Sequence, residues 1–189
     1  MGTKGRRLQS KNTEYEEPKL LSRIQDIVKL AEEKNLYHQR GMLDIESLIH
    51  EISEVEDVPI SIRYEEMDQS QSGSLNYESG GWIIRVNSIH NKKRQRFTLA
   101  HELGHYILHK NKTTDFRDTT FFRNEDKTSL EYMANDFASA LLMPDEKVKE
   151  CVKEGIRKIS DLADKFEVSS SAMRYKVERM GYKIQNERR

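Results

Sequence analysis

The five residues His101-Glu102-Leu103-Gly104-His105 constrain what this chain can fold into more than any other feature. Two histidines four positions apart lie on one face of a helix, little more than a turn from each other, so both imidazoles can bind the same metal ion. Zinc–nitrogen bonds of about 2.0–2.1 Å fit that spacing without straining the helix. A glutamate directly after the first histidine can face a water molecule on the metal and act as a general base. The spacing therefore predicts a zinc peptidase.

The residues around the motif predict that it lies on a buried core helix. Apolar side chains cover much of the helix circumference, and they are Phe97, Leu99, Ala100, Leu103, Ile107 and Leu108. Gly104 costs about 1 kcal/mol relative to alanine inside a helix. We therefore expect a packing reason for it, such as the close approach of a strand or of substrate backbone. The simpler alternative is a pair of histidines on a half-buried helix that hydrogen-bond to backbone or water.

A catalytic zinc site needs a third protein ligand, often a glutamate on a later helix. The helix predicted there carries Glu131 at the head of a stripe of small and apolar residues, Ala134, Asn135, Ala138, Leu141 and Leu142. A lone carboxylate in that place is costly to bury unless it is paired or binds a metal. Ala134 and Ala138 would allow close packing against the first helix, and Pro144 should end this helix near Met143. The alternative is that Glu131 is an exposed first-turn residue that only favours the helix dipole.

Taken together, the two segments resemble the ImmA/IrrE family of metallopeptidases. The resemblance rests on residues 96–105 and then on Glu131, Ala134-Asn135, Phe137-Ala138 and Leu141-Leu142-Met143-Pro144. It is strong from Trp82 to Pro144 and looser on either side. Many members carry an acidic residue at the position of Met133, which points elsewhere on the helix than Glu131.

The resemblance implies a ligand set, a mechanism and a substrate. Zinc (Zn²⁺) would be bound by His101, His105 and Glu131, although manganese is left open as the metal in the cell. Glu102 would be the catalytic glutamate, which takes a proton from water and later delivers it to the leaving amine. The substrate would be a cytoplasmic helix-turn-helix transcriptional repressor encoded nearby. Its cleavage would switch on mobile-element, stress or toxin–antitoxin genes.

The remaining periodicity predicts an α+β fold. Alternating apolar and polar residues predict three strands, over residues 58–64, 73–77 and 82–87. Gly80-Gly81 is compatible with a hairpin turn between the last two. Helical spacing predicts two earlier helices, over residues 20–34 and 44–53, with Asp44 as the cap of the second. These elements favour a zincin-like, gluzincin-type domain with a small antiparallel sheet packed on the helix of the motif, and an edge strand of such a sheet commonly pairs with extended substrate.

The chain is expected to divide into a flexible tail, a zinc metallopeptidase domain and a C-terminal helical segment, over residues 1–18, 19–150 and 151–189. Residues 159–182 predict a helix, a tight turn and a second helix, which resembles a helix-turn-helix. Glu167 replaces the glycine common in that turn. From residue 153 onward there are ten Lys/Arg and six Asp/Glu, a net charge of about +4.

Two interpretations of this C-terminal segment are open. One is DNA contact through Arg174, Lys176 and Arg179. The favoured one is a helical module that braces the peptidase or docks a protein partner, because the excess of positive charge is modest for tight DNA binding. A second functional class follows from the first interpretation: a non-catalytic metal-binding regulator that binds DNA or a repressor. Glu102 argues against it, because a structural metal site needs no general base.

The composition indicates the cellular compartment in which the protein is expected. Lys+Arg and Asp+Glu both number 32, so the formal net charge is zero and no general attraction to polyanions is expected. The single cysteine, Cys151, excludes an internal disulfide framework and suits a reducing compartment. No apolar run approaches the length of a membrane span, and the first residues lack the apolar core of a signal peptide. We therefore expect a cytoplasmic protein without a membrane partner.

Overall fold

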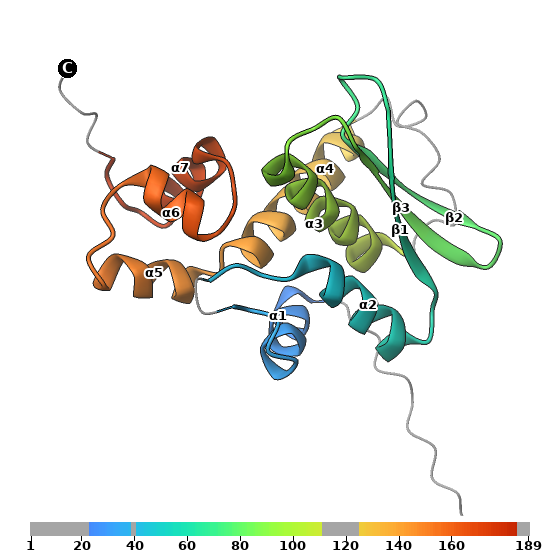
Figure 1. The fold of residues 1–189 in the computed structure, drawn as a ribbon, viewed down its shortest axis with the longest axis horizontal. Coiled ribbons are helices and arrows are strands. Elements are labelled where there is room, and N and C mark those ends of the chain that lie inside the picture. The colour runs from blue at the N-terminus through green and yellow to red at the C-terminus, as the bar shows by residue number, and fades with distance from the viewer. Residues whose placement is uncertain (1–22, 39–40, 111–124, 185–189) are drawn as a thin grey trace, which may run out of the picture.

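The computed structural model describes residues 23–38, 41–110 and 125–184 of the chain (Figure 1). Within these residues the chain forms seven helices and three strands. The helices are α1 (Ile24–Glu33), α2 (Ile45–Glu56), α3 (Lys92–His109), α4 (Glu125–Leu142), α5 (Asp145–Lys153), α6 (Ile159–Lys165) and α7 (Ser170–Arg179). The strands are β1 (Ile60–Glu65), β2 (Gly73–Glu78) and β3 (Gly81–Asn87). The predicted tail, residues 1–18, lies outside the described residues. None of the described helices is long and apolar enough to cross a membrane.

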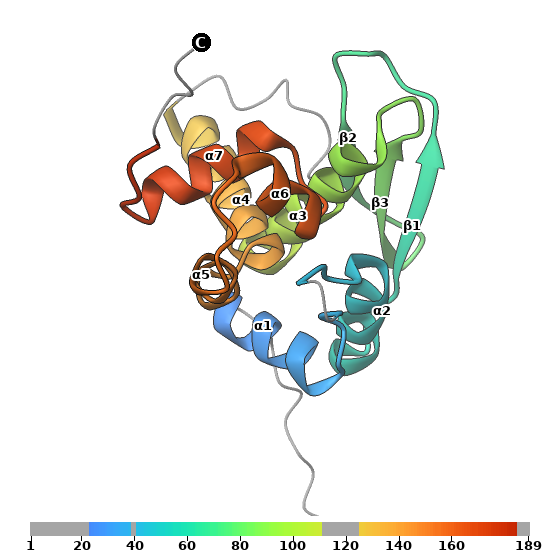
Figure 2. The same ribbon diagram turned by 60° about the vertical axis from the view of Figure 1, so that its left-hand side comes forward.

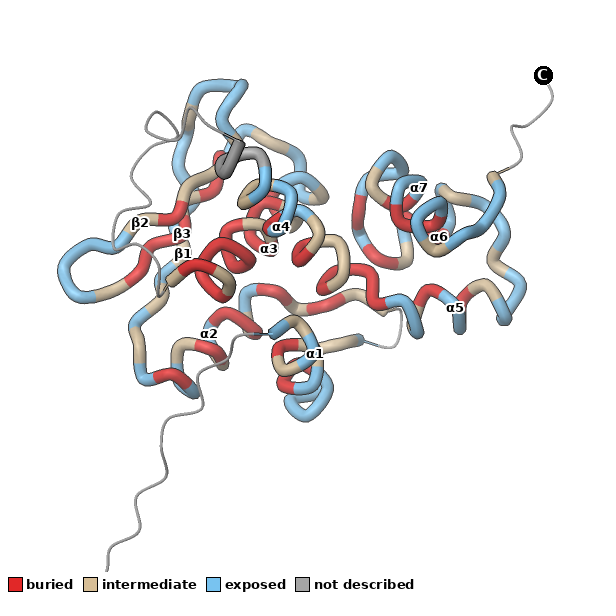
Figure 3. The backbone as a smooth tube through the Cα atoms, turned by 180° about the vertical axis from the view of Figure 1, so that it is seen from behind, coloured by how far each residue is buried: buried red, intermediate tan, exposed pale blue. Residues whose placement is uncertain are grey.

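The helix of the histidine motif, α3, runs through the middle of the molecule. Asn91 caps its start, because its Oδ1 atom accepts a hydrogen bond from the backbone N–H of Arg94 at 3.0 Å. Buried residues gather on α3, on β3 and on the second half of α4 (Figure 3). The prediction of a buried core helix is confirmed, and only the cap at Asn91 was missed. The cap of α2 is Asp44, as predicted, with its carboxylate accepting from the N–H of Ser47 at 3.0 Å.

The sheet is mixed rather than antiparallel, and its strand order is β1-β3-β2. β2 and β3 form the predicted antiparallel hairpin, with a turn at Ser79 and Gly80, which both have positive φ. β1 pairs with the other side of β3 and runs parallel to it. The expectation of an all-antiparallel sheet was therefore wrong for β1. The chain reverses once between β1 and β2 and again at the hairpin, so β1 and β3 point the same way and can pair only in parallel.

One face of this sheet packs on α3, and the other carries mostly polar side chains. The packed face carries Leu75, Trp82, Ile84 and Val86, all of which are buried in the common core. On the opposite face the Arg85 guanidinium donates to Asn76 and to Glu78, each at 3.0 Å. The alternation along β3 thus turns Trp82, Ile84 and Val86 toward the helix that carries the histidine motif, and Ile83 to the other side.

Helices α5, α6 and α7 follow α4 in the chain, and α6 packs against α7 (Figure 2). The tight turn between α6 and α7 places Glu167 in the left-handed region, with φ of 50°, where glycine is common in such turns. Ser169 caps α7 by accepting from the N–H of Ala172 at 3.1 Å. One hydrophobic core extends from Ile27 to Val177. The division of the chain at residue 150 stays a prediction.

Candidate metal centre

Close packing of α3 against α4 brings the start of α4 beside the histidine motif. A Cβ atom added at Gly104 would lie 3.2 Å from the carbonyl oxygen of Ala134 and 3.1 Å from Phe137. Ala134 and Ala138 are fully buried, as their spacing predicted. The neighbour that requires glycine is therefore helix α4, and the expectation of a strand or of substrate backbone was wrong.

Three side chains converge where these helices meet. The Nε2 atoms of His101 and His105 face each other at 3.0 Å. The Glu131 carboxylate lies 3.2 Å from Nε2 of His101 and 3.5 Å from Nε2 of His105. One donor atom from each of the three residues lies within 4.8 Å of the others. The structure thus brings together the three residues that were predicted as metal ligands.

The spacing of these donor atoms fits a tetrahedral metal ion. An ion with ligand bonds of about 2.0–2.1 Å separates neighbouring ligand atoms by about 3.3 Å, close to the three distances of 3.0, 3.2 and 3.5 Å. Two imidazoles that face each other through Nε2 also need a shared proton or a cation between them. Two nitrogens and one carboxylate, with a fourth position open, are the donor set of many catalytic zinc sites.

Asn135 orients the first histidine. Its Oδ1 atom accepts a hydrogen bond from Nδ1 of His101 at 3.1 Å. With the proton held on Nδ1, the lone pair of Nε2 points toward Glu131 and His105. Burial lowers the pKa of His101, but hydrogen bonding to Glu131 and the nearby Glu102 carboxylate outweigh it, so the pKa is raised above its ordinary value. The sequence pattern predicted that Asn135 lies on the same face of α4 as Glu131, but it did not predict the hydrogen bond to His101.

The carboxyl groups of Glu131 and Glu102 have opposite pKa shifts. Hydrogen bonds from His101 and His105 lower the pKa of Glu131 well below its ordinary value. Burial raises the pKa of Glu102, although both histidines oppose the shift. The lowered pKa keeps Glu131 ionised, as a metal ligand must be. The raised pKa of Glu102 makes its carboxylate a stronger proton acceptor than an exposed glutamate.

Strand β2 lies against the Glu102 side chain. A Cβ atom added at Gly73, the first residue of β2, would lie 2.5 Å from Cγ2 of Thr98 and 3.5 Å from Oε1 of Glu102. A larger residue would push the strand away from α3. No sequence pattern indicated this contact, because it joins segments about 30 residues apart.

Two neighbours of the motif lie in the interior and outside the donor set. Tyr106 is buried, and its hydroxyl donates to the Glu56 carboxylate at 2.5 Å. Lys110 forms an ion pair with the same carboxylate. His109 is also buried, with its ring centroid 5.7 Å from that of His105.

Two of the three basic residues considered for DNA contact form ion pairs with carboxylates of the same chain. The ammonium group of Lys176 lies 2.6 Å from the Asp145 carboxylate, and Lys176 is buried. Arg179 forms an ion pair with Asp136, and its guanidinium carbon lies 5.9 Å from the ring centroid of Tyr132. These contacts attach α7 to α4 and α5. Arg174 is exposed.

Comparisons with known proteins show the family of the chain. Residues 55–178 match the family model described as the IrrE N-terminal-like domain, Peptidase_M78. That is more than half of the chain, so the chain belongs to this metallopeptidase family.

Three relatives are similar over part of their length. Metallopeptidase ImmA of Bacillus subtilis is 35% identical over 102 residues, which cover 53% of this chain and 57% of that protein. Radiation response metalloprotease IrrE of Deinococcus radiodurans is 35% identical over 98 residues, which cover 49% and 30%. Uncharacterized immunity region protein 2 of Bacillus phage phi105 is 34% identical over 88 residues, which cover 47% and 51%. The matches span between about a third and just over half of these relatives.

A solved structure shares the fold. It is described as a Mycobacterium tuberculosis transcriptional regulator, and it superposes with a TM-score of 0.52 at 15% sequence identity. The superposition covers 82% of this chain and 52% of that chain. At this identity the likeness concerns the architecture only.

Proposed function

We propose that this chain is a zinc-dependent regulatory endopeptidase in which His101, His105 and Glu131 hold the metal. The observation that carries the proposal is the convergence of three donor atoms at 3.0, 3.2 and 3.5 Å beside the buried carboxyl group of Glu102. A bound zinc ion supplies Lewis-acid polarisation of the scissile carbonyl and lowers the pKa of a water ligand. Membership of a metallopeptidase family supports the same chemistry.

Glu102 is the general base in this proposal. Its carboxylate takes a proton from the attacking water and later delivers it to the leaving amine. Burial raises its pKa, which makes the carboxylate a stronger base than an exposed glutamate. Asn135 keeps the Nδ1 proton on His101, so that Nε2 of His101 stays available to the metal.

Strand β2 is suited to hold the substrate in an extended form. Within the residues that the structure describes, β3 pairs with one side of β2 and no strand pairs with the other. An extended peptide can add to such an edge through backbone hydrogen bonds. Because Gly73 brings β2 close to Oε1 of Glu102, a peptide along this edge would pass beside the proposed base.

The proposed substrate is a cytoplasmic protein, a helix-turn-helix repressor encoded near this chain's gene. The similarity to a phage protein named for an immunity region supports a role in gene control. The ion pairs of Lys176 and Arg179 weigh against the alternative of a regulator that binds DNA through its C-terminal helices.

The test is cleavage of a purified repressor encoded beside this chain's gene, together with metal analysis of the protein. Glu102→Gln is expected to retain zinc and to lose cleavage. His101→Ala and Glu131→Ala are expected to lose the metal, whereas His50→Ala, at an exposed histidine on α2, should change neither property. Cleavage by the Glu102→Gln protein would remove Glu102 from its role.

A further inference from the structure

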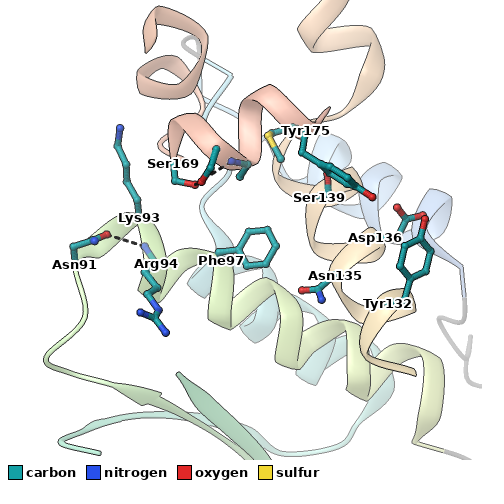
Figure 4. Close-up of a pocket in the computed structure, with 13 residues that line it drawn as sticks. Asn91, Lys93, Arg94, Phe97, Tyr132, Asn135, Asp136, Ser139, Ser169 and Tyr175 are labelled. Carbon is teal, nitrogen blue, oxygen red and sulfur yellow. Dashed lines mark hydrogen bonds between the residues drawn. The ribbon is translucent and has the colours of Figure 1, made fainter. Parts of the chain in front are cut away.

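A cavity of about 630 Å³ opens between α3, α4 and α7 (Figure 4). Phe97 lies in its centre, with Tyr132 and Tyr175 at one end and Asn91, Lys93 and Arg94 at the other. Its volume lies within the range of about 300–1,000 Å³ that is typical of binding sites for small organic groups. The cavity is thus large enough for a bulky side chain and part of a neighbouring residue.

The cavity adjoins the proposed metal centre along both helices that form it. Phe97 precedes His101 by four residues on α3, and Asn135 follows Glu131 by four residues on α4. Residues spaced in this way are neighbours on a helix surface, about 5–6 Å apart. Asn135 belongs to both regions, because it lines the cavity and bonds to His101. A group that binds the metal can therefore place a substituent in this cavity.

The C-terminal helix α7 supplies one wall of the cavity. Ser171, Ala172 and Tyr175 line it from α7, opposite Phe97 on α3. The ion pairs of Lys176 with Asp145 and of Arg179 with Asp136 join this wall to α5 and α4. Basic residues of α7 therefore take part in attaching α7 beside the cavity.

The charged groups of the wall are paired or point out of the cavity. Lys93 pairs with Asp164 at 2.6 Å, and Asp136 pairs with Arg179. The guanidinium of Arg94 donates to the hydroxyl of Ser72 at 2.9 Å and points away from Phe97 (Figure 4). The space around Phe97 therefore suits an apolar group.

We propose that this cavity is a specificity subsite for the substrate, and the proposal rests on the proposed function. It takes a bulky apolar side chain next to the cleaved bond, which packs on Phe97. The C-terminal helices thereby serve substrate selection, because α7 closes the subsite.

The test uses two hydroxamates, which bind zinc through the same group and differ in the rest of the molecule. They are acetohydroxamate and 3-phenylpropanohydroxamate. Binding to the zinc-loaded full chain is measured by displacement calorimetry, without any substrate. The phenyl group is expected to tighten binding by about tenfold or more, because part of its apolar surface is buried.

Matched variants test whether the phenyl group occupies the cavity. Ser171→Trp fills the subsite and should abolish the gain from the phenyl group, whereas Ser170→Trp, at the adjacent exposed serine outside the cavity, should retain it. Equal affinities for the two compounds, or an unchanged phenyl gain in Ser171→Trp, would overturn the subsite. Failure of acetohydroxamate to bind the zinc-loaded chain would instead refute the metal centre, and the subsite with it.

Discussion

The side chain of Asn135 accepts a hydrogen bond from Nδ1 of His101 at 3.1 Å, one helical turn beyond Glu131 on the neighbouring helix. Helix α4 thus contributes twice to the candidate centre, once through a ligand and once through the group that orients another ligand. Such outer contacts fix the tautomer of a metal-binding histidine and raise its basicity.

Asn135→Ala is expected to weaken zinc binding by about 10–100-fold, because His101 loses the acceptor that fixes its Nδ1 proton. Zinc affinity is measured by competition with a chromophoric chelator. The matched control is Ser139→Ala, one turn further along α4 and partly exposed, which should bind zinc as the wild type does. Equal affinities for the Asn135→Ala and wild-type proteins would exclude an orienting role.

Removal of the metal is expected to destabilise the protein. A ligand that binds only the folded chain stabilises it by about 4 kcal/mol when its free concentration is about 1,000 times Kd. The three proposed ligands come from two helices, so an ion would hold α3 and α4 together. Thermal unfolding should therefore shift to lower temperature after treatment with a chelator and recover when zinc is added. His101→Ala should show no such dependence on zinc.

Gly104→Val should destabilise the fold by about 1–3 kcal/mol, because the added atoms overpack the contact with Ala134 and Phe137. Urea unfolding measures this loss. The variant should also bind zinc more weakly, since α4 carries Glu131 and must move away from the two histidines. Ala140→Val, at a partly exposed position on α4, is the control and should leave zinc binding intact. A destabilised Gly104→Val protein with normal zinc affinity would show that α4 can shift without moving Glu131.

Lys110→Ala is expected to lower the free energy of unfolding by about 3–5 kcal/mol, because it breaks a buried ion pair with the Glu56 carboxylate. The double variant Glu56→Leu with Lys110→Met should recover much of that loss, since it removes both charges together. Lys29→Ala breaks an exposed pair with Glu33 and should change stability by less than about 1 kcal/mol. Urea unfolding of the four proteins gives the comparison.

The full chain is expected to bind DNA weakly and without sequence preference, with Kd no tighter than about 1 μM at physiological salt. Lys176 and Arg179 are paired with carboxylates of the same chain, so less positive charge is left for phosphate groups. Gel shifts at two salt concentrations, with the DNA upstream of the neighbouring gene and with a scrambled duplex, measure this. Strong binding to one of the two duplexes would favour the regulatory alternative.

The features that the sequence predicted well depend on local spacing. Four-residue spacing placed His101 and His105 on one helix face, and the stripe that contains Ala134 and Ala138 indicated which face of α4 packs inward. The features it missed depend on distant segments. The parallel pairing of β1 follows from the path of the whole sheet, and Gly73 meets Glu102 only after that sheet has packed on α3. No periodicity within a short window contains that information.

The edge of β2 that no described strand pairs with affects how the protein behaves in concentrated solution. A strand edge that can receive a peptide can equally receive a strand from another copy and so begin aggregation. β2 is only six residues long, and its last two residues, Tyr77 and Glu78, are exposed, so the carboxylate of Glu78 lies at one end of that edge. A strand of six residues gives another copy little length to pair with, which favours solubility while the edge stays accessible.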